Sequence, residues 1–285
     1  MTFRLLTPGL CTMLVDFGRP KFRSLGVPVG GAADRWSLAL GNALVGNAPQ
    51  TPALEICLAG PTVRADCDLA CVVFGAPFRI GAQKSLTVGT TFTLRQGEEL
   101  RVETTDFGMR AYLCVRGGLH GKNVLGSQSS LEPLRAGTEF RCSPETISPR
   151  FFRPETTWNL EPKILRTLDG PQADWFRREE FFQRAFRVSE TSNRMGLRLQ
   201  GQPLTLPNRE LISEPVCPGA VQVTRDCQCI VLGVDGQTIG GYPKIAQVIS
   251  ADIDKIGQLR PADSIRFRRV SLDEAETIYQ QKQLE

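Results

Sequence analysis

Residues 236–252 read GQTIGGYPKIAQVISAD, a glycine-rich turn followed directly by an apolar run. Gly240 and Gly241 allow a positive φ and a close approach of backbone, and Pro243 ends ladder hydrogen bonding just before Lys244. The polar side chains of this short span are Gln237, Thr238, Tyr242 and Lys244. The stretch therefore predicts a functional turn that is anchored on a scaffold of β-strands.

Other segments of the same half of the chain supply further charges. Asn193 and Arg194 lie in a polar segment, Glu214 lies in a second one, and Asp235 directly precedes the glycine-rich turn. Together they provide hydrogen-bond donors, acceptors and both signs of charge. We therefore expect the 236–244 turn and the 193–194 segment to face one shared cleft.

The composition is that of a globular protein. The chain has 285 residues, of which 41% are hydrophobic, which suits about two domains of roughly 150 residues each. The net charge of +4 comes from 34 basic and 30 acidic residues spread along the sequence, so we expect no nucleic-acid partner. The apolar runs are far shorter than the roughly 20 residues of a membrane helix, and the N-terminus lacks a secretory signal pattern. We expect a cytoplasmic protein without a membrane partner.

The cysteines and the single histidine limit the chemistry. The nine cysteines include no Cys-x-x-Cys pair, so no structural zinc site is expected, and Cys71, Cys114 and Cys229 lie in apolar runs typical of reduced core thiols. His120 is the only histidine and has no nucleophile motif beside it, which argues against catalytic triads. The sequence contains neither a Walker loop nor a Met-Lys biotin-acceptor pattern, so any biotin is attached to another protein.

The first half combines a loop, a helix and many short apolar runs. Asp34 is the predicted N-cap of a helix that Gly46 ends. Gly30 and Gly31 lie just before this helix, where unsatisfied N–H groups favour an anionic group; a plain cap is the alternative. The apolar runs of residues 55–140 are separated by turns and predict an antiparallel barrel or sandwich.

The second half repeats this pattern after a proline-rich segment. Residues 143–162 contain four prolines and no periodicity, which predicts a boundary between a domain at 1–150 and a domain at 151–285. The elements expected after it are a strand at 163–168, an amphipathic helix from 173 to about 184, strands at 220–223 and 230–234, and a C-terminal helix that a capping box begins at Ser271.

The glycine-rich motifs recur in an order that resembles one known family. The motifs are DFGR (16–19), GVPVGGAAD (26–34), NALVGN (42–47), ALE (53–55), GP (60–61), GG (117–118), GS (126–127), GPQ (170–172), SNRMG (192–196), SE (213–214), PG (218–219), GQT (236–238), GGYP (240–243), VISAD (248–252) and LRP (259–261). The chain resembles the carboxyltransferase-type family that contains the C subunit of 5-oxoprolinase, the KipA-type antagonist of a kinase inhibitor, and the part of urea carboxylase similar to allophanate hydrolase subunit 2. The resemblance covers residues from near 5 to about 268.

This resemblance implies a mainly β fold of two cyclophilin-like β-barrel domains with a few short helices. It implies a subunit of an ATP-dependent 5-oxoprolinase-type amidohydrolase, which converts the small amide 5-oxoproline to L-glutamate and is inactive without its partners. ATP would be shared with a partner subunit, and Mg²⁺ is compatible with such a site. The implied partners are a subunit-B-like carboxyltransferase or KipI-type protein and the A subunit of lactam utilisation.

Two alternatives remain open at this point. One is a non-catalytic, KipA-like regulatory module that sequesters a partner protein, and the other is a carboxyltransferase subunit related to urea carboxylase or allophanate hydrolase. Residues 119–137 lack a glycine-rich insertion that is usual in the family, which favours the binding module. The charged residues around the glycine-rich turn favour the enzyme, because a pure binder need not keep such groups together.

Residue roles follow from the needs of lactam opening, which requires cations for carboxylate or phosphate and carboxylates for water or metal. Glu214 and Asp235 are the expected base or metal-ligand residues, and Lys244 is the expected catalytic point charge for phosphate. The expected substrate-binding residues are Asn193, Arg194, Gln237, Thr238, Gly240, Gly241, Tyr242, Gly30, Gly31 and Asp34. The structural alternatives are an internal ion pair of Arg194 with Glu214 and a solvated Lys244.

Overall fold

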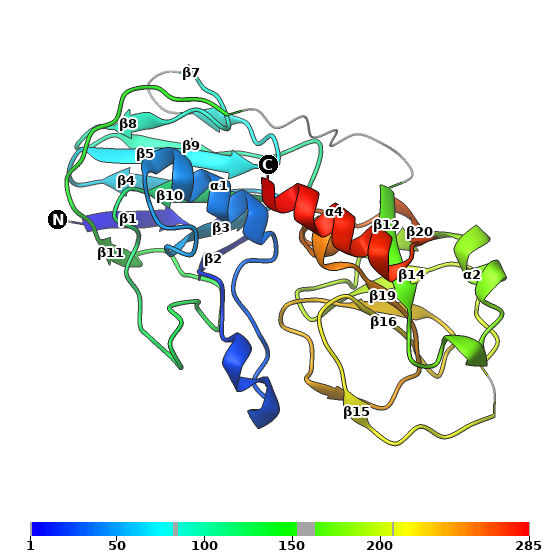
Figure 1. The fold of residues 1–285 in the computed structure, drawn as a ribbon. Helices are drawn as coiled ribbons and strands as arrows, with labels where there is room; N and C mark the ends of the chain where they lie inside the picture. The colour runs from blue at the N-terminus through cyan, green and yellow to red at the C-terminus, as the bar shows by residue number, and fades with distance from the viewer. Residues whose placement is uncertain (1, 82–84, 153–162, 207, 285) are drawn as a thin grey trace. The chain divides into compact units, whose positions relative to one another are not determined.

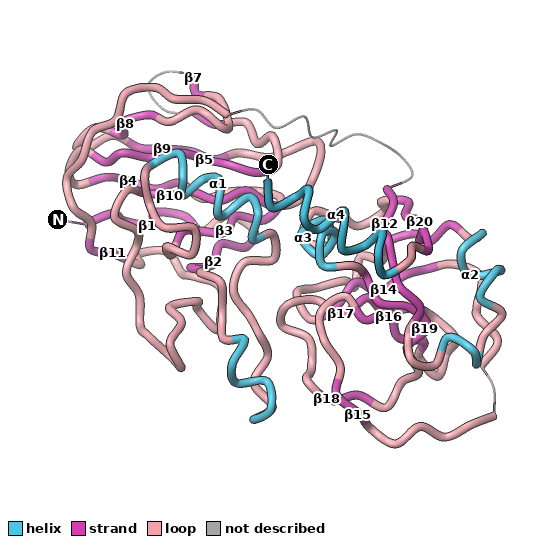
Figure 2. Tube along the Cα trace, in the orientation of Figure 1, coloured by secondary structure: helices cyan, strands magenta, loops and turns pink. Residues whose placement is uncertain are grey.

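The computed structural model describes residues 2–81, 85–152, 163–206 and 208–284. It is mainly β with few, short helices (Figures 1 and 2), which confirms the predicted fold class. The chain forms two compact units. One consists of Met1–Arg19 and Gly30–Asn159, and the other consists of Pro20–Val29 and Leu160–Glu285.

The first unit contains two sheets, of six and five strands, which matches the sandwich alternative expected from the sequence. The six-stranded sheet has the order β11-β1-β4-β9-β6-β7 and the five-stranded sheet the order β2-β3-β10-β5-β8. The strands of the six-stranded sheet are β1 (Thr2–Thr7), β4 (Thr62–Ala65), β6 (Ile80–Gly81), β7 (Ser85–Leu86), β9 (Glu99–Val102) and β11 (Glu139–Arg141). Those of the five-stranded sheet are β2 (Cys11–Val15), β3 (Ala53–Cys57), β5 (Leu69–Gly75), β8 (Phe92–Leu94) and β10 (Arg110–Val115).

Both faces of the five-stranded sheet are buried. Side chains alternate along each strand, so neighbouring residues enter two different apolar clusters. Leu113 of β10 belongs to a large core that also contains Phe3 of the six-stranded sheet. Tyr112 points the other way and joins a second apolar cluster with Leu38 of helix α1 (Arg35–Val45). Helix α1 lies against β5 and β10 (Figure 1). Each face of the sheet thus packs against its own apolar cluster, which explains why its strands are near-continuous apolar runs.

Helix α1 begins and ends where the sequence predicts. The Asp34 side chain accepts a hydrogen bond from the Ser37 N–H at 2.9 Å, and Gly46 adopts the left-handed C-cap conformation with φ of 81°. Within the helix, Trp36 packs edge-on against Phe74 at 6.4 Å between ring centroids.

The second unit is a closed barrel of seven strands in the order β12-β19-β16-β17-β14-β13-β20. The strands are β12 (Lys163–Asp169), β13 (Ala185–Val188), β14 (Gly196–Gln200), β16 (Ala220–Val223), β17 (Cys229–Leu232), β19 (Lys244–Val248) and β20 (Ser264–Arg269). Strands β12 and β20 pair in parallel and close the barrel. A separate two-stranded ribbon is formed by β15 (Glu214–Pro215) and β18 (Ile239–Gly240).

The remaining helices are short except the last one. They are η1 (Pro20–Leu25), η2 (Ala173–Trp175), α2 (Arg178–Gln183), η3 (Ser250–Asp252), α3 (Ile253–Ile256) and α4 (Leu272–Leu284). The Ser271 half of the predicted capping box is present, since the Glu274 N–H donates to Ser271 Oγ at 3.1 Å at the start of α4, while Glu274 Oε1 pairs with Arg268.

The prediction of a single amphipathic helix from 173 to about 184 is wrong. The segment forms η2 and α2, separated by Phe176, whose backbone is extended with φ of −120° and ψ of 158°. Phe176 and Phe181 both enter the barrel core, where Phe181 stacks on Phe267 at 4.8 Å between centroids. Burial of two aromatic rings in the core therefore outweighs the helical preference of the segment.

The cysteines are all free thiols, and the three that were assigned to the core are buried. Burial raises the pKa of Cys229 to about 12, so that sulfur is held as an unreactive thiol. Across the described ranges no helix is long and apolar enough to cross a membrane.

Candidate functional site

Lys244 and Glu214 form the centre of a polar group in the second unit. Lys244 opens strand β19 and donates through Nζ to Glu214 Oε1, and Gln172 Nε2 donates to the same oxygen at 2.8 Å. Lys244 is only 5% exposed, so the alternative of a solvated turn lysine is wrong. The hydrogen bonds from Lys244 and Gln172 lower the pKa of Glu214, which is therefore a carboxylate at neutral pH.

The Gly170–Gln172 turn is bound tightly to strand β19. The Gln172 N–H donates to Lys244 O at 3.1 Å, and the Lys244 N–H donates to Gln172 Oε1 at 3.0 Å. A Cβ on Gly170 would lie 2.3 Å from Lys244 O, so only glycine permits this approach. Sequence reasoning did not select Gln172 as a site residue, although its GPQ motif was among those that carried the family resemblance.

Gln222 and Gln237 extend the group along the neighbouring strand. Gln222 of β16 is the cross-strand partner of Lys244, and Gln237 Nε2 donates to Gln222 Oε1 at 3.3 Å. A Cβ on Gly240 would lie 2.8 Å from Gln222 Nε2, so the ribbon strand β18 lies directly on this amide. We refer to Gln172, Glu214, Gln222, Gln237 and Lys244 as the amide–lysine cluster. Gln222 was also missed, but its position between Val221 and Val223, which face the barrel core, marks it as pointing outward.

Arg194 forms a separate ion pair with Asp235. Its Nε lies 2.6 Å from Asp235 Oδ2 and its Nη2 lies 3.2 Å from Asp235 Oδ1, a two-point contact. The Asp235 N–H also donates to Arg194 O at 3.1 Å, which joins the two segments through backbone. The prediction of an ion pair between Arg194 and Glu214 is therefore wrong. Arg194, the expected carboxylate or phosphate clamp, and Asp235, an expected base, neutralise each other.

The other residues selected from the sequence in this unit differ in burial and in hydrogen bonding. Asn193 Oδ1 accepts from the Met195 N–H at 2.9 Å, and Thr238 is buried with its carbonyl accepting from the Val216 N–H at 3.0 Å. Gly241 and Tyr242 are exposed. Their contacts with substrate, and a cleft shared by the 236–244 turn and the 193–194 segment, stay predictions.

A buried carboxylate network holds the Gly30–Asp34 loop of the first unit. Glu55 Oε2 accepts from the Ala33 N–H at 2.8 Å and from the Tyr112 hydroxyl at 2.8 Å, and Tyr112 in turn accepts from the Asp34 N–H at 2.8 Å. Arg110 pairs with Glu55 at 3.3 Å, and both side chains are less than a tenth exposed. Burial raises the pKa of Tyr112, and the neighbouring Glu55 adds to the shift. The N–H groups just before helix α1 are therefore taken by protein, as the plain-cap alternative requires.

Asp16 organises the adjoining turn in the same unit. Its Oδ1 accepts from the hydroxyls of Ser127 and Ser129 at 2.6 Å each and from the Gly18 N–H at 2.7 Å, and its Oδ2 accepts from the Gln128 N–H at 2.7 Å. Burial alone would raise the pKa of Asp16, but these four hydrogen bonds outweigh it and lower the pKa below its ordinary value. Residues 127–129 thus have a structural role in holding this turn.

This network predicts how Asp16→Asn responds to pH. Because the pKa of Asp16 is lower in the folded than in the unfolded chain, its ionised form stabilises the fold above about pH 4, and this contribution disappears as the pH falls through the folded pKa. We expect Asp16→Asn to lower the free energy of unfolding more at about pH 7 than at about pH 2. Urea denaturation at both values measures this, with the exposed Asp106→Asn as control; equal losses at both values would contradict it.

Gly30 and Gly31 complete this loop with φ of 64° and 77°. A Cβ on Gly31 would lie 2.5 Å from Gly18 N and 2.6 Å from Asp16 O, so the two turns touch through backbone alone. Direct contact of Gly30, Gly31 or Asp34 with substrate stays a prediction.

Gly31→Ala is expected to destabilise the first unit far more than the backbone angle alone requires. Gly97 of the same unit has a similar φ of 78°, and a Cβ added there would meet nothing within 4 Å, so Gly97→Ala is the matched control. We expect losses of about 1 kcal/mol for Gly97→Ala and about 3 kcal/mol or more for Gly31→Ala, measured by denaturation. Similar losses in the two variants would show that the contact with Asp16 is not tight.

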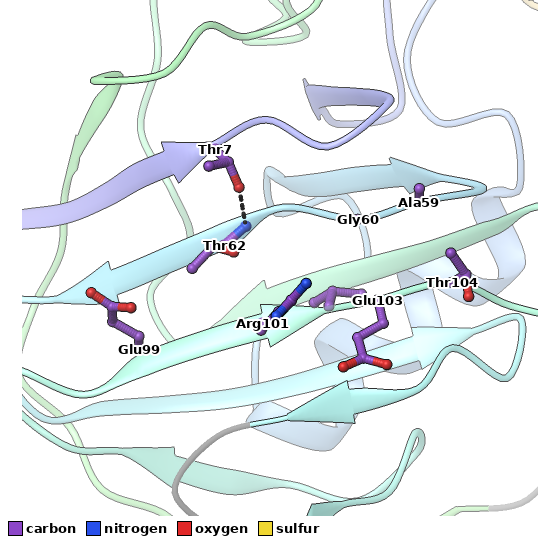
Figure 3. A pocket seen from close by; sticks show the side chains of 9 residues that line it. Thr7, Ala59, Gly60, Thr62, Glu99, Arg101, Glu103 and Thr104 are labelled. Atoms are coloured by element: carbon purple, nitrogen blue, oxygen red, sulfur yellow. Dashed lines mark hydrogen bonds between the residues drawn. The ribbon is translucent and has the colours of Figure 1, made fainter.

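An open pocket of about 650 Å³ lies on the outer face of the six-stranded sheet (Figure 3). Arg101 on β9 stands between Glu99 and Glu103, opposite Thr62 of β4. None of the residues selected from the sequence lines it. Nor do the residues that the structure covers contain a group of three or more His, Cys, Asp or Glu arranged to hold a metal ion.

The fold and site define a two-unit β protein in which glycines of two turns pack against Lys244 and Gln222. Residues 25–269 match the family described as carboxyltransferase domain, subdomain A and B, and the chain belongs to this family. It is 35% identical over 273 residues to the C subunit of 5-oxoprolinase from Haemophilus influenzae, covering 91% of this chain and 88% of that protein. It is 35% identical over 294 residues to the C subunit of 5-oxoprolinase from Escherichia coli, covering 95% and 92%.

The structural comparison agrees with this family. The crystal structure of the Kluyveromyces lactis urea amidolyase superimposes with a TM-score of 0.90 at 27% identity, covering 99% of this chain and 19% of that one. Another solved relative, with 33% identity and a TM-score of 0.85, is matched over 94% of this chain and 55% of its own. The chain thus spans about half, or less, of the solved proteins that it matches.

Proposed function

We propose that this chain is a subunit of a 5-oxoprolinase-type amidohydrolase complex, which opens the lactam of 5-oxoproline to give L-glutamate. The observation that carries the proposal is the 35% identity to two proteins named as the C subunit of 5-oxoprolinase, over about nine tenths of both chains in each comparison. A protein named as the C subunit of an enzyme has partner subunits. The proposed partners are a subunit-B-like carboxyltransferase or KipI-type protein and the A subunit of lactam utilisation.

The amide–lysine cluster supports this proposal through its chemistry. Opening a lactam adds water across the C–N bond, and negative charge develops on the carbonyl oxygen. Lys244 and Gln222 supply N–H donors that stabilise such an oxygen, and the ionised Glu214 carboxylate, whose pKa is lowered, accepts a hydrogen bond that orients the attacking water. The proposed catalytic residues of this chain are accordingly Glu214 and Lys244. Asp235 forms an ion pair with Arg194, and its proposed role is to position that arginine.

The two cations expected to bind phosphate, Lys244 and Arg194, are not arranged to hold a nucleotide. Lys244 is paired with Glu214, and Arg194 is paired with Asp235, so neither cation offers uncompensated charge to a phosphate. We therefore place ATP and any Mg²⁺ on a partner subunit.

Reconstitution tests the proposed function. The purified chain alone is expected to give little or no glutamate from 5-oxoproline, and the mixture with its partner subunits and ATP is expected to give sustained production. Omitting this chain from the mixture should abolish it. Full production by the chain alone would refute the division of work, and no production by the complete mixture would refute the function.

A second candidate rests on the structural likeness to the urea amidolyase, which spans 99% of this chain. In that case the chain is a carboxyltransferase component that acts on a urea-type amide. The same mixture, assayed with urea, bicarbonate, ATP and a biotinylated carrier, decides between the two. A KipA-like module would instead bind a partner protein while the mixture stays inactive with both substrates.

A further inference from the structure

Gln222 carries an amide donor that the protein leaves unused. The side chain is 1% exposed, yet its Nε2 has no hydrogen-bond partner among the described residues. Burying an amide N–H without a partner is unfavourable by about 1–3 kcal/mol, so such a group needs an explanation. Its oxygen is also weakly used, since it accepts one long bond, of 3.3 Å, from Gln237.

The groups around this amide differ in exposure. Gln222, Lys244 and Gln172 are each less than a tenth exposed, whereas the Glu214 side chain is 36% exposed and Gln237 is partly exposed. Gly170 packs against Lys244 and Gly240 packs against Gln222, so both glycines lie against the cluster. Two glycines are thus placed where any side chain would displace the cluster.

The charge of the cluster selects the kind of ligand. Lys244 and Glu214 cancel each other, and the other three members are neutral carboxamides. A phosphate or carboxylate would meet no net positive charge there and would lose its hydration. A neutral group that offers one acceptor and one donor matches the unused Nε2 of Gln222 and the half-exposed carboxylate of Glu214.

We propose that the amide–lysine cluster is a subsite that reads the edge of a neutral cis-amide, the C=O and N–H that a lactam presents side by side. The carbonyl oxygen accepts from Gln222 Nε2, and the ligand N–H donates to the Glu214 carboxylate. This subsite would recognise the amide edge of 5-oxoproline, and in that respect it rests on the proposed function.

Small ligands that differ by one group test the proposal without any mutation. In ligand-observed NMR titrations of the purified chain, 2-pyrrolidinone and 5-oxoproline should bind, whereas L-proline, which lacks the ring carbonyl, should not. N-methyl-2-pyrrolidinone has no N–H and should bind at least about tenfold more weakly than 2-pyrrolidinone, because it leaves Glu214 without a donor. Equal binding of these two lactams, or no binding of 2-pyrrolidinone, would overturn the proposal.

Variants of Gln222 locate the contact. Gln222→Met removes both polar atoms at similar volume, and Gln222→Glu keeps the oxygens but removes the N–H donor. Both should weaken 2-pyrrolidinone binding at least about tenfold, while Gln202→Met, at an exposed position of the same unit, should leave it unchanged. If either Gln222 variant is folded and binds 2-pyrrolidinone as the native chain does, the subsite is elsewhere.

The subsite and the proposed function fail in distinguishable ways. A reconstituted mixture that opens 5-oxoproline with native KM when it contains Gln222→Met keeps the proposed function and removes the subsite. A chain that binds 2-pyrrolidinone through Gln222 while the complete mixture opens no 5-oxoproline keeps the subsite and removes the function.

Discussion

Replacing Glu55 by alanine is expected to lower the free energy of unfolding by about 3–5 kcal/mol, because the change removes a buried carboxylate that pairs with the buried Arg110 guanidinium. The same change removes the acceptor of the Ala33 N–H and of the Tyr112 hydroxyl, which lie before helix α1. The loss should appear in chemical denaturation as a lower midpoint of the first unit's transition.

Glu139→Ala is the matched control for this prediction. Glu139 also pairs with an arginine, Arg4, at 2.7 Å, but their side chains are 45% and 37% exposed, so its loss should be about 1 kcal/mol or less. Comparable losses for Glu55→Ala and Glu139→Ala would show that burial of the Glu55 network adds nothing. Recovery of most of the stability in a Glu55→Met, Arg110→Met double variant would support the desolvated pair as the cause.

Lys244→Met should lower the 5-oxoproline turnover of the reconstituted mixture by about 100- to 1000-fold, equivalent to about 3–4 kcal/mol of transition-state stabilisation. The reason is that Lys244 is the only cation of the amide–lysine cluster and stands beside the unused Gln222 donor. Lys163→Met is the control, since Lys163 pairs with Asp263 at 2.6 Å in the same barrel and should leave turnover within about twofold of native.

A double variant separates catalysis from bracing at Lys244. Removing the lysine alone also breaks an ion pair, which can lower stability by about 3–5 kcal/mol where it is buried and by less at the half-exposed Glu214. Lys244→Met with Glu214→Gln removes both charges and should restore much of that stability. If turnover returns together with stability, the pair only braces the ribbon, and Lys244 has no part in the chemistry.

The sequence was most informative where local rules act. Short apolar runs separated by turns led to a mainly β fold, and the limits of helix α1 followed from Asp34 and Gly46, whose capping needs only neighbouring backbone. The helix expected at 173–184 failed because Phe176 leaves the helical path to enter the barrel core. That preference depends on strands far away in the sequence, so periodicity alone could not reveal it.

The candidate site was predictable in its segments and not in its pairings. Glu214, Asp235, Arg194 and Lys244 were all selected, but the partners follow from strand register and backbone contacts such as the bond from the Asp235 N–H to Arg194 O. Gln222 carries no charge, and it occupies one outward position of an apolar strand, which made it inconspicuous.

The same limit applies to the network in the first unit. Glu55 and Tyr112 lie in strands that are otherwise mostly apolar, and although Glu55 belongs to the ALE motif (53–55), no local signal indicated that the two side chains bond to each other. Both faces of this sheet are buried because helix α1 covers one of them. The carboxylate of Glu55 and the phenol of Tyr112 are found together on the face that α1 covers.

The parallel pairing of β12 with β20 joins the first and last strands of the barrel, and β1 likewise pairs with β11 in the first unit. During vectorial synthesis, β12 and β13 leave the ribosome long before β20 and must wait with unpaired edges until the final strand arrives. Closure therefore depends on contacts of high sequence separation, which form slowly. A nascent chain that stalls before β20 exposes two open strand edges, each a template for pairing with another chain.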